Sequence, residues 1–172
     1  MEPKARPRPA YLKRPPRVET AAEHRARLAT YAVERGHAHT LRRHLAEGLD
    51  PEAKFFYRGV GFTSERLMGE AVWLGSVDCV KALEDAGARL RDEEILRALH
   101  PGHNREMVAY LLATGKFDPY GLMTSGRPWA DAIDELDQES MSDLVEIISE
   151  WERAKLVDAL EPPAARSRPS FL

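Results

Sequence analysis

Apolar residues recur at helical spacing between Ser64 and Leu90. The first run comprises Leu67, Met68, Ala71 and Val72, and the second comprises Val77, Val80 and Leu83. Gly75 separates the two runs, and Gly87 follows the second. Glycine adopts the positive φ that ends a helix at little steric cost. The stretch therefore predicts two short helices joined by a tight turn and closed by a glycine.

The same pattern occurs on both sides of this stretch. The upstream copy comprises Ala32, Gly36, Leu41, Leu45 and Gly48, and the downstream copy comprises Ala98, Gly102, Val108, Leu111, Leu112 and Gly115. A fourth, less regular copy begins at Pro128 and Trp129 and has no closing glycine. Because no alternating strand pattern accompanies these copies, we expect an all-α chain. It should contain at least seven helices in antiparallel pairs, with Gly48, Gly87 and Gly115 just after helix ends.

The skeleton Ala71-x-x-x-Gly75, then Val80-x-x-Leu83-x-x-x-Gly87-Ala88, resembles an ankyrin repeat, a unit of about 33 residues. The resemblance extends over roughly residues 20–160 and comprises three to four divergent repeats. It implies an ankyrin-like solenoid of antiparallel helix pairs. It also implies that a protein partner is bound by the loop tips and by the exposed side of the first helix in each pair.

Composition separates the two ends of the chain from this repeat region. Residues 1–18 contain five prolines and six basic residues against one acidic residue, a side-chain charge of +5. So little of this arm is apolar that we expect it to be disordered, as we do for residues 161–172. Alternatively, the arm docks on an acidic partner, on nucleic acid or on the acidic end of its own chain. The repeat domain is assigned to residues 19–160.

The start of the folded region has a local signature. Thr20-x-x-Glu23 is a capping box, in which each side chain satisfies a backbone donor at the start of a helix. The helix that follows should present one apolar face, comprising Leu28, Ala29, Tyr31 and Ala32. His37, His39 and His44 have no cluster of cysteines or carboxylates at ligand spacing nearby, so we expect structural roles and no metal site.

Several functional classes find no support in the sequence. It contains no phosphate-binding loop, nucleophile elbow, zinc-protease motif or dinucleotide fingerprint, so we expect neither catalysis nor a cofactor. Without the arm, the net charge of −3 becomes −8, which makes nucleic acid an unlikely partner of the folded part. The chain has one cysteine, Cys79, and no apolar run of membrane-spanning length. We therefore expect a cytoplasmic protein of one domain, monomeric when free, with its cysteine buried and inert.

One inter-repeat connection is longer than the others. Gly36 and Gly75 are 39 residues apart, and the additional residues lie around Phe-Phe-Tyr-Arg-Gly-Val-Gly-Phe at positions 55–62. Two glycines in this run suggest a hairpin or a tight loop. Its rings either fold back as a small local core or project as an aromatic finger, and aromatic residues with arginine are typical of interface hot spots.

Candidate partner-binding residues follow from the loop tips and from the acidic last repeat. The tips carry Phe55, Phe56, Tyr57, Arg58, Arg89, Arg91, Phe117 and Tyr120. Residues 129–161 contain eleven acidic residues against two basic ones, and Glu146 and Glu150 share one face of the last predicted helix. This face is either an ordinary solvated surface or a patch that steers a partner.

The sequence therefore favours a non-catalytic protein–protein interaction module that binds a specific partner. Two alternatives fit the same residues. One is a bacterial immunity protein or antitoxin that blocks a cognate toxin, for which the acidic last repeat would suit a cationic toxin. The other is an adaptor or chaperone for a secreted effector.

Overall fold

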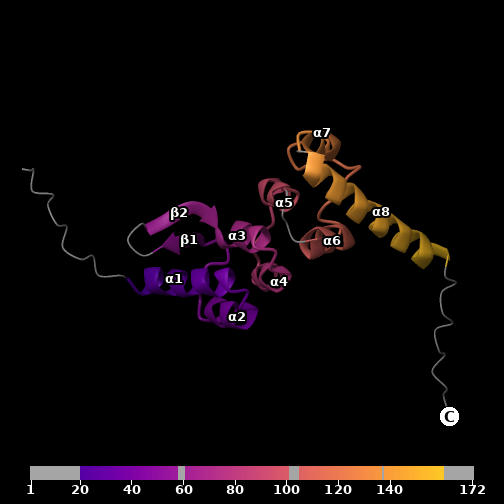
Figure 1. Cartoon of the computed structure of the whole chain (residues 1–172). Coiled ribbons are helices and arrows are strands. Elements are labelled where there is room, and N and C mark those ends of the chain that lie inside the picture. The colour runs from indigo at the N-terminus through magenta and orange to yellow at the C-terminus, as the bar shows by residue number, and fades with distance from the viewer. Residues whose placement is uncertain (1–19, 58–60, 101–104, 137, 161–172) are drawn as a thin grey trace, which may run out of the picture.

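The computed structural model describes residues 20–57, 61–100, 105–136 and 138–160, and all structural statements below concern these residues. They form eight helices and one two-stranded antiparallel sheet (Figure 1). In chain order the elements are α1 (Ala21–Glu34), α2 (Ala38–Ala46), β1 (Lys54–Tyr57), β2 (Gly61–Arg66), α3 (Leu67–Trp73), α4 (Val77–Asp85), α5 (Asp92–Ala98), α6 (Arg105–Ala113), α7 (Trp129–Ile133) and α8 (Gln138–Leu160). The mostly helical architecture is confirmed, and the single two-stranded sheet lies where the sequence suggested a hairpin or a tight loop.

The helices are arranged in two rows. Within the pairs, α1 packs on α2, α3 on α4 and α5 on α6. Along the rows, α3 lies between α1 and α5, and α4 lies between α2 and α6. The rows run from α1 and α2 at one end to α8, which covers α6 at the other (Figure 1). None of the described helices is both long and apolar enough to cross a membrane.

Glycines end the second helix of each pair, as the pattern predicts. Gly48, Gly87 and Gly115 lie two residues after the last residues of α2, α4 and α6, with φ of 88°, 98° and 68°. In each case the residue after the glycine donates its N–H to a carbonyl of the last helical turn, for example Ala88 to Leu83 at 2.9 Å. Residues with a side chain rarely adopt such backbone angles, so glycine is required by the conformation.

Helix starts are also set by local sequence. In the capping box of α1, Glu23 donates its N–H to the Thr20 hydroxyl at 3.2 Å, and Thr20 donates its N–H to the Glu23 carboxylate at 2.8 Å. At the start of α5, Arg91 donates its N–H to Glu94 at 2.9 Å. The apolar face predicted for α1 was partly wrong: Ala29 is buried, but the Tyr31 side chain is exposed.

The core is continuous through the stacked pairs. The buried side chains of the central helices include Leu67, Met68, Ala71, Val72, Cys79, Val80 and Leu83. Leu83 and Ala71 have no exposed surface, which confirms the spacing argument at these positions. The Cys79 thiol is also fully buried, and burial raises its pKa, which disfavours the reactive thiolate. Leu144 and Ile147 of α8 extend the same core.

The additional residues of the long connection form the β1–β2 hairpin. Phe56 pairs with Phe62 in antiparallel register, and the hairpin packs on α1 and α3. The side chains of Phe55 and Phe56 are only 1% and 7% exposed, and Phe56 donates its N–H to the Thr30 hydroxyl at 3.1 Å. The aromatic finger is therefore wrong for these two residues, because burying the rings against α1 removes more apolar surface from water than projecting them would. The Tyr57 side chain and Arg58 lie outside the described residues.

Candidate functional site

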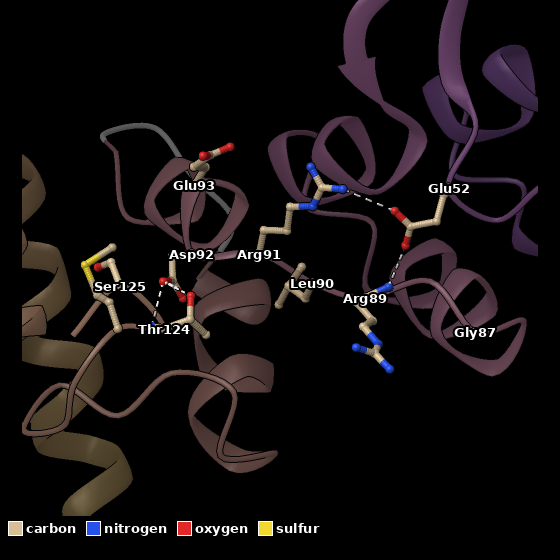
Figure 2. Close-up of a pocket in the computed structure, with 10 residues that line it drawn as sticks. Glu52, Gly87, Arg89, Leu90, Arg91, Asp92, Glu93, Thr124 and Ser125 are labelled. Carbon is tan, nitrogen blue, oxygen red and sulfur yellow. Dashed lines mark hydrogen bonds and ion pairs between the residues drawn. The ribbon is translucent and has the colours of Figure 1, made fainter. Parts of the chain in front are cut away.

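An open groove of about 750 Å³ runs along the connection between α4 and α5 and faces the loop that follows α6 (Figure 2). We call it the loop-tip groove. Its lining residues are Glu52, Gly87, Arg89, Leu90, Arg91, Asp92, Glu93, Met123, Thr124 and Ser125. Two of the arginines predicted to contact a partner, Arg89 and Arg91, thus share one concave surface.

An ion-pair network that joins the buried Arg66 and Glu94 to the partly exposed Glu52 adjoins this groove, with Arg66 at the end of β2 as its centre. The Arg66 side chain is 8% exposed, and its Nη1 donates to the Glu94 carboxylate of α5 at 2.6 Å. Its Nη2 donates to the Glu52 carboxylate and, at 3.0 Å, to the Arg89 carbonyl. One guanidinium therefore joins the hairpin, α5 and the connection that carries the groove arginines. We call this set Arg66, Glu52 and Glu94 the Arg66 network.

Glu52 fixes the backbone at the groove. It accepts the Arg89 N–H at 2.9 Å, and its other oxygen lies 3.5 Å from Arg91 Nη2. The Arg89 N–H, followed by the guanidinium groups of Arg66 and Arg91, holds the pKa of Glu52 below its ordinary value. Glu52 is therefore a carboxylate near neutral pH, and it keeps Arg89 and Arg91 in a defined place.

The pKa of Glu94 is shifted in the opposite direction from that of Glu52. Burial raises the pKa of Glu94, against the Arg91 N–H and the Arg66 guanidinium, which both favour its ionised form. A buried carboxylate of this kind depends on its hydrogen-bond partners, since an isolated charge in the interior is costly.

The opposite wall of the groove is held by Asp92 at the first turn of α5. Asp92 accepts the Thr124 N–H at 2.7 Å and also the Thr124 hydroxyl (Figure 2). The loop itself closes through a bridge between Leu122 and Pro128 and through Gly126, which has a φ of 85°. Both sides of the groove are thus attached to α5.

The two groove arginines differ in whether their guanidinium groups form an ion pair within the protein. Arg91 points towards Glu52, although 56% of its side chain stays exposed (Figure 2). The Arg89 guanidinium points away from Glu52 and has no ion pair within the described part of the chain. Planar guanidinium groups bind carboxylates in a two-pronged geometry, so the Arg89 guanidinium can bind an acidic group of a ligand, although Glu52, Asp92 and Glu93 also line the groove.

The predicted tip residues Phe117 and Tyr120 do not line this groove. Phe117 was expected at an exposed tip, but its side chain is buried with its ring 5.2 Å from the Trp129 ring in an edge-on contact. Phe117 is buried because Trp129, at the start of α7, packs against its ring. Tyr120 is exposed as expected, and its hydroxyl donates to Glu152 of α8 at 2.7 Å.

The acidic pair of the last helix lies apart from the groove and is partly neutralised. Glu146 and Glu150 are both exposed on α8, and Arg105 of α6 lies 3.3 Å and 2.5 Å from their carboxylates. The acidic charge of this face is therefore smaller than the sequence count indicates.

A second surface was missed by the sequence reasoning. Tyr31, Trp73 and Leu74 lie at the ends of α1 and α3 and are 47%, 48% and 42% exposed. We call these residues the α1–α3 face. Trp73 and Leu74 directly precede the turn glycine Gly75. Two large apolar residues next to a turn glycine could have indicated an exposed apolar surface, but the helical periodicity did not identify them.

Within the described residues, no group of three or more histidine, cysteine or acidic residues is arranged to hold a metal ion. No protein-family model matches the chain, and a search of curated proteins finds no match either.

Proposed function

We propose that this protein is a non-catalytic protein-interaction module of the ankyrin-like type, which binds a protein partner at the loop-tip groove. The observation that carries the proposal is the pair of exposed arginines, Arg89 and Arg91, on a surface whose backbone is fixed by the buried Arg66 network. The glycine-closed helix pairs in two rows support the ankyrin-like part of the proposal.

Preorganisation is the physical reason for choosing this surface. Binding costs the entropy of every side chain and loop that must become ordered, so a backbone that is already fixed favours affinity. Here Glu52 holds the Arg89 amide, and Asp92 holds the facing loop through Thr124. Leu90 and Met123 add apolar lining between the charged groups. We infer a partner that presents a carboxylate next to an apolar side chain. We also place this interaction in the cytoplasm, because the whole chain has a single cysteine, which is buried.

The proposal is tested by capture with the full chain as bait in extracts of its native organism. The decisive variant is Arg89→Glu. Arg89 forms no ion pair with a described residue, so its substitution should leave the fold intact. The matched control is Arg153→Glu, the same charge change at an exposed position of α8.

We expect one protein to be retained by the wild type and by Arg153→Glu. Arg89→Glu should weaken its binding about tenfold or more in a titration with the purified partner, with an unchanged thermal midpoint. A partner that binds Arg89→Glu and the wild type equally would refute the groove. A chain that retains no protein under these conditions would refute the interaction function as well.

A further inference from the structure

The α1–α3 face combines three large, half-exposed apolar residues from two neighbouring helices. Helices α1 and α3 pack side by side, and a Cβ placed on Gly36 would lie 3.6 Å from the Ser76 hydroxyl oxygen, so the turns that end the two helices touch. Trp73 and Leu74 belong to one of these turns, and Tyr31 lies one helical turn before the other. The three half-exposed residues therefore lie near the same ends of two neighbouring helices.

Two carboxylates without an ion pair lie within this surface. Glu34 of α1 and Glu70 of α3 have no salt bridge to any described residue, and burial together with the nearby Glu34 charge raises the pKa of Glu70. The neighbouring Arg97 lies 2.7 Å from Glu65, and its charge acts in the opposite direction on the pKa of Glu70, lowering it.

The arginines of α1 do not offset the repulsion between the Glu34 and Glu70 carboxylates. Arg27 lies over the Tyr31 ring at 6.0 Å, and Arg35 is exposed beyond the helix end. The charges that act on the pKa of Glu70 are those of Glu34, Arg97 and Glu65, and neither arginine of α1 is among them.

We propose that the basic, proline-rich segment of residues 1–18 of the same chain docks on the α1–α3 face. This segment lies outside the described residues, and only its sequence enters the argument. It carries five prolines and six basic residues. Proline-rich segments bind to surfaces lined by aromatic rings at a low entropic cost. Its lysines and arginines supply the positive charge that Glu34 and Glu70 lack.

The segment is long enough to reach this face. Tyr31 lies eleven residues after Thr20 along α1, which corresponds to about 17 Å of helix. Eighteen residues of a proline-rich segment span up to about 56 Å. Attachment at Thr20 also gives the segment an effective concentration of roughly millimolar at nearby surfaces.

The acidic face of α8 is the competing site within the chain. Its residues Glu146 and Glu150 already have Arg105 as a common partner, at 3.3 Å and 2.5 Å. They also lie on the helix at the opposite end of the rows from α1 (Figure 1). The α1–α3 face offers aromatic rings together with carboxylates that form no salt bridge to a described residue, and a proline-rich basic segment can contact both at the same time.

The test uses the full chain with Tyr11→p-benzoylphenylalanine, a photoreactive residue in the basic segment. The protein is irradiated over a dilution series, digested, and its cross-links are mapped by mass spectrometry. We expect cross-links within one molecule, at a yield independent of concentration, to peptides that contain Tyr31 or Trp73. Glu34→Lys/Glu70→Lys should lower this yield about fivefold. The matched pair Glu146→Lys/Glu150→Lys should leave it unchanged.

Three results would overturn the proposal: cross-links that fall mainly on α8, cross-links between two copies that disappear on dilution, or no cross-link above the level in urea. Circular dichroism checks that each charge variant is folded. If Glu34→Lys/Glu70→Lys does not fold, Trp73→Ala serves in its place, because this exposed ring should be required for docking and not for folding. An unchanged yield in folded Trp73→Ala would equally overturn the proposal.

Discussion

Substituting Arg66 should show how much the Arg66 network contributes to stability. In Arg66→Met the aliphatic length of the side chain is kept and the charge is lost. Glu94, with a side chain 8% exposed, would keep only the Arg91 N–H as a hydrogen-bond partner among the described residues. Glu52 would keep both the Arg89 N–H and Arg91. Breaking a buried pair costs about 3–5 kcal/mol because one charge stays behind without compensation. Because only Glu94 is left as a buried charge without its counter-charge, we expect Arg66→Met to lower the free energy of unfolding by about 3 kcal/mol.

A double-mutant cycle separates the charge from the packing. Glu94→Gln alone removes the buried charge and leaves Arg66 bound to Glu52, so it should cost less than Arg66→Met. The double variant Arg66→Met/Glu94→Gln leaves no orphaned charge and should cost about 1–2 kcal/mol, less than the sum of the single changes. Free energies of unfolding come from urea titrations followed by circular dichroism, with comparable slopes in all four proteins.

The pH dependence provides an independent check. Without Arg66 the pKa of Glu94 rises further, so the folded variant binds a proton more tightly than the unfolded chain does. The stability deficit of Arg66→Met should be smallest near the unfolded pKa of about 4.3 and should grow as pH rises through the folded pKa. A loss below about 1 kcal/mol at neutral pH, or strictly additive single changes, would refute our account of the network.

Other predictions concern the core, a turn and the acid response. Leu83→Ala should cost about 2–5 kcal/mol in urea unfolding, and an unchanged midpoint would mean that Leu83 is not buried. Gly87→Ala should cost about 1–2 kcal/mol, because φ is 98° and no atom crowds the new methyl group; Gly87→Asn should cost less. The lowered pKa of Glu52 stabilises the fold above about pH 4.5, and this contribution is lost as pH falls. Glu52→Gln should therefore flatten the acid side of the thermal midpoint against pH, and an unaltered profile would contradict this.

Repeated local signals made the helices predictable. These signals are the glycines at positions 48, 87 and 115 and the capping box at Thr20. Each acts within a few residues, so it can be recognised directly in the sequence. The hairpin was harder to predict, because Phe55 and Phe56 gain their burial from α1, more than twenty residues earlier. A run of aromatic residues has the same composition whether it packs inward or projects, and only the neighbouring surface decides between these outcomes.

The candidate site was only partly visible in the sequence. Arg89 and Arg91 were identified from their place after a closing glycine, since this position puts side chains at a loop tip. Nothing local connects them to Arg66, which lies 23 residues before Arg89 and joins the groove through its buried side chain. The Arg105 contacts that neutralise Glu146 and Glu150 also join different helices, and a count of charges along the chain does not detect them.

The arrangement of the rows also sets where the molecule opens first. Helix α3 contacts α1, α4, α5 and the hairpin, whereas α8 packs chiefly on α6. Opening free energies of individual elements follow such contacts, so backbone amides of α8 should exchange with deuterium before those of α3 and α4. The loop that forms one wall of the groove lies between α6 and α7, before α8, and is attached to α5 by Asp92. A ligand that spans the groove would add a second attachment between these parts, and its binding should be detectable as slower exchange in α8.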